Sequence, residues 1–198
     1  MIRLLALTPV ILLVLLTSCF SYKEFPVESD YSYSGDFRRY KTFNFLDTRS
    51  SGEDSTIQNE IIERAVRARM ELQGYEFSER APRLLISYKI FYDSLDFTGY
   101  EQPELELFVK YENYVEQDMN PVDYKLKQGT LLVLMYDREL KKSIWQGYAS
   151  GVFGAGFYQD KRVLQGAVRS IFDKYRVFAE DFYKRQIRKK KKNKVSFR

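Results

Sequence analysis

Histidine is absent from this chain of 198 residues, and cysteine occurs only once. The lack of histidine excludes Ser-His-Asp and Cys-His catalysis, histidine-ligated zinc and the ordinary histidine pH switch. A single cysteine cannot form a disulfide within the chain. Because no other catalytic or ligand-binding motif is recognisable, we assign no catalytic, cofactor-binding or metal-binding residue and predict that the protein is not an enzyme.

Long apolar runs are also scarce, since the chain has just one, from Leu4 to Leu16, with Arg3 in front of it. This layout is typical of a signal peptide. A membrane-spanning helix needs about 20 apolar residues, and Pro9 would interrupt such a helix. The run therefore predicts export through a signal peptide over residues 1–18 rather than a permanent membrane span.

The only cysteine follows this run directly, in Leu16-Thr17-Ser18-Cys19. These four residues resemble the lipobox of bacterial lipoproteins, in which a branched apolar residue and two small residues precede cysteine. The resemblance implies cleavage between Ser18 and Cys19, a diacylglyceryl group on the Cys19 thiol and an acyl chain such as palmitate on the freed amine. The alternative is a chance buried or free cysteine without a role in export.

Two or three acyl chains would hold Cys19 to a membrane stably. Residue 20 is Phe, whereas an Asp at this position in similar lipoproteins implies retention in the inner membrane. We therefore expect the outer membrane. Residues 21–24 contain a single acid rather than an acidic cluster, which favours the periplasmic face. A surface-exposed lipoprotein that meets host molecules stays open as an alternative.

Charge is divided unevenly along the chain. Residues 184–198 hold nine Lys or Arg and no acid, whereas residues 19–183 hold 22 basic and 27 acidic residues. An acidic body repels phosphates, so we expect no nucleic-acid partner. The tail is either a solvated, disordered run or a segment attracted to anionic lipid headgroups, lipopolysaccharide phosphates or wall polymers.

The expected organisation is a signal peptide (1–18), a lipidated tether (19–36), a folded domain (37–183) and a basic C-terminal tail (184–198). The tether assignment rests on a polar, Ser/Tyr-rich composition with Pro26 and Gly35. At 180 residues, the mature chain is long enough for one domain with its own core.

Apolar periodicity predicts the elements of that domain. Strands are expected at 37–46, 84–92, 104–112, 129–137 and 144–150, with the last two forming a hairpin. One helix is expected from a capping box of Ser55 and Gln58 to Gly74, with its apolar face formed by Ile57, Ile61, Ala65, Ala68 and Leu72. A second helix begins near Asp160. The segments around Gly99, Pro103, Asn120 and Pro121 are expected to be loops.

The resulting order β-α-β-β-β-β-α predicts an α+β fold, with an antiparallel sheet of about five strands and both helices packed on one face. The segments FRRYKTFNF, LLISYKI, GTLLVLMYD, IWQGYASG and VRSIFDKY together resemble bacterial lipoproteins that carry the domain of unknown function numbered 4136. This resemblance covers roughly residues 30–180. It implies the same fold and membrane attachment, and it brings no functional residues with it. The basic extension after Tyr175, into which the last helix is expected to continue, departs from the family pattern.

Three further features carry competing interpretations. Asp137 and Glu139, at a strand end, form either a hydrolytic carboxylate pair or an ordinary acidic turn. Trp145 with Tyr148 forms either a stacking platform for a sugar or part of the core. The glycine-rich loop 151–157 is a plain connection, an apolar tip of Val152, Phe153 and Phe157, or a phosphate cradle, although it lacks the Gly-Lys-Ser/Thr that would follow.

Our leading hypothesis is a non-enzymatic, lipid-anchored cell-envelope protein that binds a partner or supports the envelope. The partners expected are the membrane, through the lipid on Cys19, and an envelope protein or anionic envelope polymer. The alternative is an envelope glycan hydrolase that uses Asp and Glu carboxylates without a metal.

Overall fold

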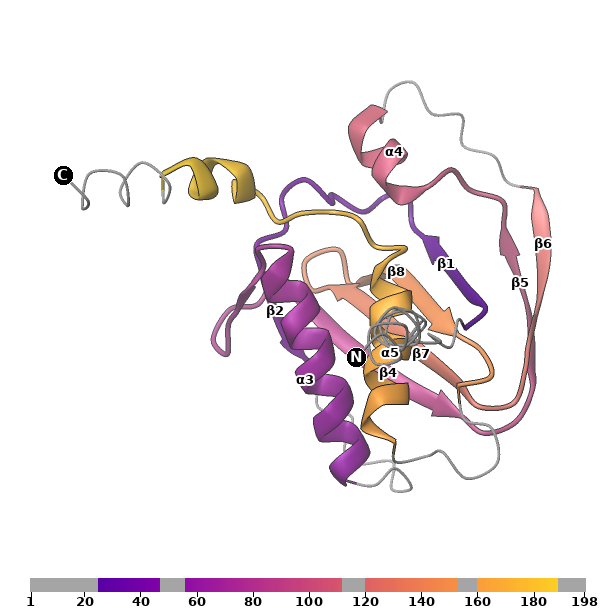
Figure 1. Cartoon of the computed structure of the whole chain (residues 1–198). Coiled ribbons are helices and arrows are strands. Elements are labelled where there is room, and N and C mark those ends of the chain that lie inside the picture. Colours follow the sequence, from indigo (N-terminus) through magenta and orange to yellow (C-terminus); the bar gives the residue numbers. More distant parts are fainter. Residues whose placement is uncertain (1–24, 47–55, 112–119, 153–159, 189–198) are drawn as a thin grey trace, which may run out of the picture.

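A computed structural model of the chain describes residues 25–46, 56–111, 120–152 and 160–188. It is a mixed α+β fold, which confirms the expected class. A six-stranded sheet forms its centre, with strands in the order β1-β8-β7-β4-β2-β3 (Figure 1). In chain order these strands are β1 (Val27–Tyr31), β2 (Thr42–Phe45), β3 (Glu76–Phe77), β4 (Leu84–Phe91), β7 (Thr130–Asp137) and β8 (Lys142–Ala149).

The sheet is antiparallel on one side and parallel on the other. β1, β8, β7 and β4 pair antiparallel, and β7–β8 is the expected hairpin. β2 pairs in parallel with both β3 and β4. The expectation of a purely antiparallel sheet of about five strands was therefore wrong. The reason is that the helix after β2 carries the chain back to the end where β2 began, so the next strands run in the same direction.

Two helices, α3 (Thr56–Leu72) and α5 (Lys161–Phe172), cover one face of the sheet, as expected (Figure 1). Asp160 caps α5, because its carboxylate accepts hydrogen bonds from the N–H groups of Arg162 and Val163. The buried side of α3 differs from the expected one. Ile57 and Leu72 are exposed, and the buried residues of α3 are Gln58, Ile62, Val66 and Met70. Residues 57–72 contain two apolar stripes, and the sequence alone did not show which of them faces the sheet.

Trp145 and Gly147 on β8 explain why that strand contains a Trp-x-Gly pattern. Residues two apart on a strand share a face. A Cβ at position 147 would lie 2.5 Å from the Trp145 ring and 2.8 Å from Ile171 of α5. The glycine therefore leaves the space in which the indole packs between β8 and α5, against Phe172 and Tyr175.

A separate hairpin, β5 (Leu95–Tyr100) with β6 (Pro121–Leu126), forms a two-stranded sheet of its own. Phe97 and Tyr124 from this hairpin pack against Tyr148. Tyr148 is three residues after Trp145 on β8, so the two side chains point to opposite faces of the sheet. The hairpin thus covers the face of β8 that is opposite to the helices. Both strands lie where loops were expected, because Gly99 and Pro121 concealed the alternating pattern around them.

The segment expected as a strand at 104–112 instead contains the short helix α4 (Leu105–Tyr111). Its buried residues are Leu105 and Phe108, which are three apart as on a helix. The alternation of Leu105, Leu107, Val109 and Tyr111 suggested a strand, but Leu107 and Tyr111 are exposed. Leu105 and Phe108 are buried together only if the segment is helical, and their burial outweighs the strand-like alternation.

Residues 27–31, which we expected to be part of the tether, form β1 at the edge of the sheet. Residues 37–41 precede β2 as turns, with Phe37 and Tyr40 buried in the core. The folded domain therefore begins earlier than expected. A Ser/Tyr-rich composition is compatible with an edge strand, since such a strand has one partner and needs few apolar residues.

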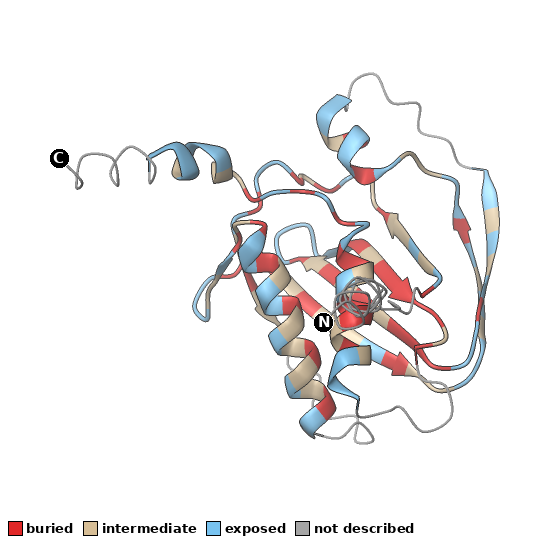
Figure 2. Cartoon of the chain, in the orientation of Figure 1, coloured by how far each residue is buried: buried red, intermediate tan, exposed pale blue. Residues whose placement is uncertain are grey.

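The last helix does not continue past Tyr175. α5 ends at Phe172 with Asp173 as its cap, and a separate helical segment spans residues 182–188. This segment, which we call the C-terminal helix, projects from the body and is mostly exposed (Figure 2). None of the helices in the described part of the chain is long and apolar enough to cross a bilayer.

Candidate functional site

Asp137 and Glu139 do not form a hydrolytic pair of the expected kind. Asp137 is fully buried and accepts hydrogen bonds from the Tyr40 hydroxyl at 2.8 Å and from two nitrogens of Arg83, both at 3.1 Å. Glu139 is exposed on the turn and also pairs with Arg83. Burial raises the pKa of Asp137, but the hydrogen bonds that its carboxylate accepts outweigh burial and leave the pKa below its ordinary value. A general acid would need the opposite shift.

The other aromatic and glycine-rich candidates also resolve in part. Trp145 is 1% exposed and Tyr148 is 1% exposed, so both are core residues rather than a stacking platform. Val152 of the glycine-rich loop is buried as well, which removes it from an exposed apolar tip. Phe153 and Phe157 lie outside the described residues, as do Ser18 and Cys19. The lipidation site therefore stays a prediction.

The feature that the sequence did not suggest is the outer edge of β1, which is an end strand of the sheet formed by the described residues. Antiparallel strands direct the peptide groups of alternate residues toward the partner strand. The Ser32 N–H donates to Ile144 and the Pro26 carbonyl accepts from Ser150, so the even-numbered residues face β8. The peptide groups of Ser29 and Tyr31 therefore point away from the sheet.

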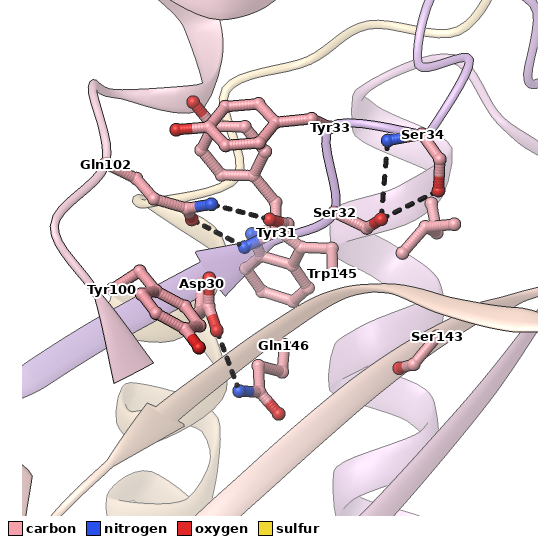
Figure 3. Close-up of a pocket in the computed structure, with 11 residues that line it drawn as sticks. Asp30, Tyr31, Ser32, Tyr33, Ser34, Tyr100, Gln102, Ser143, Trp145 and Gln146 are labelled. Carbon is pink, nitrogen blue, oxygen red and sulfur yellow. Dashed lines mark hydrogen bonds between the residues drawn. The ribbon is translucent and has the colours of Figure 1, made fainter. Parts of the chain in front are cut away.

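The Gln102 side chain forms hydrogen bonds with the outward N–H and carbonyl of Tyr31. Its side-chain oxygen accepts the Tyr31 N–H at 2.9 Å, and its side-chain nitrogen donates to the Tyr31 carbonyl at 2.7 Å (Figure 3). An amide that both donates and accepts reproduces the pairing of a neighbouring strand. The Tyr31 hydroxyl also donates to the Pro103 carbonyl at 3.0 Å. The segment that leads into α4 is thus fastened to the end of β1.

Beyond Gln102, the edge of β1 borders a cavity of about 610 Å³, which we call the edge cleft. Its walls come from β1, the β5–α4 connection, β6 and the end of α5, and Ser29 lies along it. Five carboxylates and two basic side chains line it, so the cleft is acidic at neutral pH: Glu28, Glu101, Glu104, Glu106, Asp173, Lys174 and Arg176.

A smaller cavity of about 400 Å³, the outer pocket, is also lined by Gln102 (Figure 3). Asp30 and Gln146 line it, and their side chains are 3.4 Å apart. Burial raises the pKa of Asp30, and hydrogen bonds from the chain at Tyr31 and from Gln146 offset this only in part. Tyr31, Tyr100 and Gln102 line both cavities.

An aromatic cluster holds this region in place. The Phe108 ring of α4 lies 5.2 Å from the ring of Tyr31 and 5.3 Å from that of Tyr33, between ring centroids. Tyr31 also contacts Phe37 edge to face. Aromatic pairs of this kind each contribute about 0.5–1.5 kcal/mol beyond the area they bury. The walls of the edge cleft are therefore fixed by core packing rather than by loops alone.

Sequence reasoning missed Ser29, Tyr31 and Gln102 because edge position is a property of the sheet and not of a local pattern. The alternation of Val27, Ser29 and Tyr31 was a usable sign of a strand. No group of three or more Cys, Asp or Glu side chains converges as a metal site within the described residues.

The family model described as "Domain of unknown function (DUF4136)" matches residues 27–175. The chain belongs to the DUF4136 family. The match begins at the first residue of β1, so the edge strand and every residue that lines its cleft except Arg176 lie within the matched region. No curated protein matches this chain.

Two solved structures show a distant likeness to this DUF4136 domain. One is a PDZ domain protein from Parabacteroides distasonis, with 15% identity and a TM-score of 0.47 over 77% of this chain and 35% of that one. The other is the PelC dodecamer from Paraburkholderia phytofirmans, with 11% identity and a TM-score of 0.39 over 79% of this chain and 100% of that one. The present chain thus spans about a third of the first protein. Likeness at this level carries no functional information.

Proposed function

We propose that the protein is a non-enzymatic cell-envelope lipoprotein, anchored through Cys19, whose DUF4136 domain binds an extended segment of an envelope protein along β1. The supporting observation is the outward peptide group of Ser29, which borders the edge cleft next to the position where Gln102 already acts as a strand partner. Strand addition to a sheet edge uses such peptide groups for affinity and the flanking pockets for specificity.

The acidic lining of the edge cleft indicates the chemistry of this segment. Glu28, Glu101 and Glu104 lie around the cleft, and each is exposed. Complementary charge across an interface speeds association and selects partners. The partner segment is therefore extended and basic. The lipid anchor on Cys19 would keep the domain near the membrane. The proposed location of the protein is the periplasmic face of the outer membrane.

The sharpest test is the Ser29→Pro substitution, with Ser29→Ala as its matched control. Proline lacks an N–H, and it is tolerated on an edge strand where that N–H points away from the sheet. Ser29→Pro should therefore block strand addition and leave the fold intact, which a thermal melt would check. A photo-crosslinking residue at Glu101 would then report the contents of the cleft in living cells.

Wild-type and Ser29→Ala chains should give the same crosslinked envelope partner, and a folded Ser29→Pro chain should lose it. A second copy of this chain, captured through its own basic tail, would count as such a partner. Crosslinks that persist unchanged in a folded Ser29→Pro chain would refute strand addition. So would the absence of a crosslinked protein from the wild-type chain.

A second candidate, a glycan hydrolase, is favoured by one observation, namely that burial raises the pKa of Asp30 in the outer pocket. A raised pKa suits a general acid. Glycoside hydrolysis usually needs two carboxyl groups, and Asp30 is the sole carboxyl among the described residues that line this pocket. Release of soluble sugar from purified cell-wall glycan, abolished by Asp30→Asn, would support this candidate. No release, or equal release by Asp30→Asn, would exclude it.

A further inference from the structure

The side chains of β1 alternate between the two faces of the sheet. Ser29 is opposite Gly147 of β8, where an added Cβ would contact Ile171 of α5, so Ser29 is on the face that the helices cover. Glu28 is opposite Tyr148, on the face that the β5–β6 hairpin covers. A strand added at the outer edge of β1 would divide its own side chains between the same two faces.

The hairpin side of this edge is negatively charged. Burial raises the pKa of Tyr124 of β6, and the charges of three carboxylates raise it further: Glu28, Asp30 and Glu101. Asp30 also lines the outer pocket, where its side chain points toward Gln146 (Figure 3). The described residues that line this pocket include no Lys or Arg. A cationic side chain on this side of the edge would therefore be attracted to the protein.

The helix side of the edge cleft has the opposite charge. Its charged residues follow α5 directly and are Asp173, Lys174 and Arg176. The Asp173 carboxylate already pairs with Arg69 of α3. Lys174 and Arg176 are both exposed. The wall that Ser29 faces is therefore positive, and a second cation placed against it would be repelled.

These two charges fix the order of side chains that an added strand can present. A residue that pairs with Ser29 has its side chain on the same face as Ser29, toward the positive wall. Its two neighbours in sequence have their side chains on the other face, next to Glu28 and Asp30. Gln102 already bonds to the outward peptide group of Tyr31, so Asp30 is the last residue of β1 that the added strand reaches in that direction.

We propose that the segment bound along β1 contains a basic residue, a nonbasic residue and a second basic residue, in that order. The two Lys or Arg side chains lie on the hairpin side, next to Glu28 and Asp30. The residue between them is neutral or acidic and faces Lys174 and Arg176. Tyr100 borders both cavities and is 44% exposed, so its ring is available to the cation beside Asp30. This inference rests on the strand addition proposed above and specifies the partner of the same site.

Peptide selection tests the pattern with the full chain. A random library of nine-residue peptides displayed on phage is selected against the wild-type, Ser29→Ala and Ser29→Pro chains. Peptides that the folded Ser29→Pro chain enriches bind elsewhere and are subtracted. The peptides that remain for wild type and Ser29→Ala should carry Lys or Arg at two positions that are two apart, with a nonbasic residue between them.

Synthetic peptides then give affinities by fluorescence anisotropy. An enriched peptide is compared with an isomer of equal net charge in which the two basic residues are adjacent. The alternating peptide should bind about tenfold more tightly, because the isomer places one cation against the positive wall. Asp30→Asn should weaken binding of the alternating peptide by about tenfold. The matched control, Glu79→Gln, removes an exposed carboxylate that follows β3 at the opposite edge of the sheet and should stay within about twofold.

Charge reversal on the helix side tests the middle position. The Lys174→Glu/Arg176→Glu chain should enrich peptides with Lys or Arg at this position as well, because its wall is then negative. An unchanged middle position would overturn the inference.

The outcomes separate this inference from strand addition itself. Peptides that depend on Ser29 but show no alternation, or equal binding of the two isomers, would refute the charge pattern and leave strand addition standing. If wild type enriched no peptide beyond those of the folded Ser29→Pro chain, strand addition would be refuted and the pattern with it.

Discussion

The Asp137→Asn substitution exchanges one buried oxygen that accepts hydrogen bonds for a nitrogen that donates them. Asp137 Oδ1 accepts the N–H groups of Glu139 at 2.8 Å and Leu140 at 3.1 Å and Arg83 Nε at 3.1 Å, and asparagine can keep these three bonds through its remaining oxygen. Oδ2 accepts the Tyr40 hydroxyl at 2.8 Å and Arg83 Nη2 at 3.1 Å. The new amide nitrogen would face Arg83 Nη2, so the hydrogen bond from Nη2 and the charge pairing with Arg83 are lost.

The expected cost is about 2–3 kcal/mol in the free energy of unfolding. A lost hydrogen bond to a charged group costs about 1.5–3 kcal/mol, and breaking a buried ion pair costs about 3–5 kcal/mol. The Arg83 side chain is 30% exposed, and its contact with solvent reduces the cost below the upper values. Urea unfolding at pH 7 measures the difference between wild type and variant.

The stabilisation by the Asp137 carboxylate should depend on pH. The folded-state pKa of Asp137 lies below its ordinary value of 3.8. The stabilisation is therefore fully present above about pH 4 and is lost as the pH falls through the folded-state pKa. The gap in stability between wild type and Asp137→Asn should narrow over that range.

Glu139→Gln is the matched control, because Glu139 pairs with the same arginine but is 71% exposed at its side chain. Exposed pairs contribute about 0–1 kcal/mol, so this variant should change stability little at any pH. The reasoning would be refuted if Asp137→Asn and Glu139→Gln were equally stable at pH 7. A gap that stays constant down to acid pH would refute it as well.

Three further substitutions test the packing of β8, the C-terminal helix and β1. Gly147→Ala forces a methyl group against the indole, and thermal unfolding should show a loss of about 1–3 kcal/mol, whereas an unchanged melting temperature would contradict the packing. Gly74→Ala adds a methyl group at a φ of +87° against the Phe182 ring; amide exchange in the C-terminal helix should accelerate, and unchanged exchange there would count against the packing of Phe182 on Gly74. Gln102→Ala removes both side-chain hydrogen bonds to β1, so the free energy of unfolding should fall by about 1–3 kcal/mol. Hydrogen exchange at the Tyr31 amide should also become faster. A Tyr31 amide that stays protected would show that Gln102 is not the strand partner.

Much of the central sheet was predictable because its strands have strong local patterns. The alternating run at 84–91 and the two-sided apolar run at 130–137 became β4 and β7, the two central strands of the sheet. The pairings that these strands make in the sheet agree with their local patterns. Asp160 likewise capped α5, since an Asp carboxylate at that position can accept hydrogen bonds from the first N–H groups of a helix.

The elements that were missed are those whose structure depends on distant partners. β1 exists because β8 pairs with it, and the alternation of Val27, Ser29 and Tyr31 was only a weak sign of a strand in so polar a segment. α4 is helical because Phe108 packs between Tyr31 and Tyr33, about 75 residues earlier in the sequence. The edge cleft needs β1, the β5–β6 hairpin and α4 together, so no local motif could reveal it.

The parallel pairing of β2 has the same origin. A helix after a strand is compatible with either direction of the following strand, and only packing of α3 on the sheet decides it. The Trp-x-Gly pattern could be quoted from the sequence but not explained by it. Its meaning, that Gly147 makes room for Trp145 under α5, required the position of the helix.

The anchoring of the folded domain at Cys19 is the claim on which the envelope setting rests, and the intact mass of the protein from membranes of the native host tests it most directly. We predict a chain that begins at Cys19 and carries the mass of a diacylglyceryl group and an additional acyl chain. A chain that retains residues 1–18, or one that begins at residue 19 with an unmodified thiol, would contradict the account.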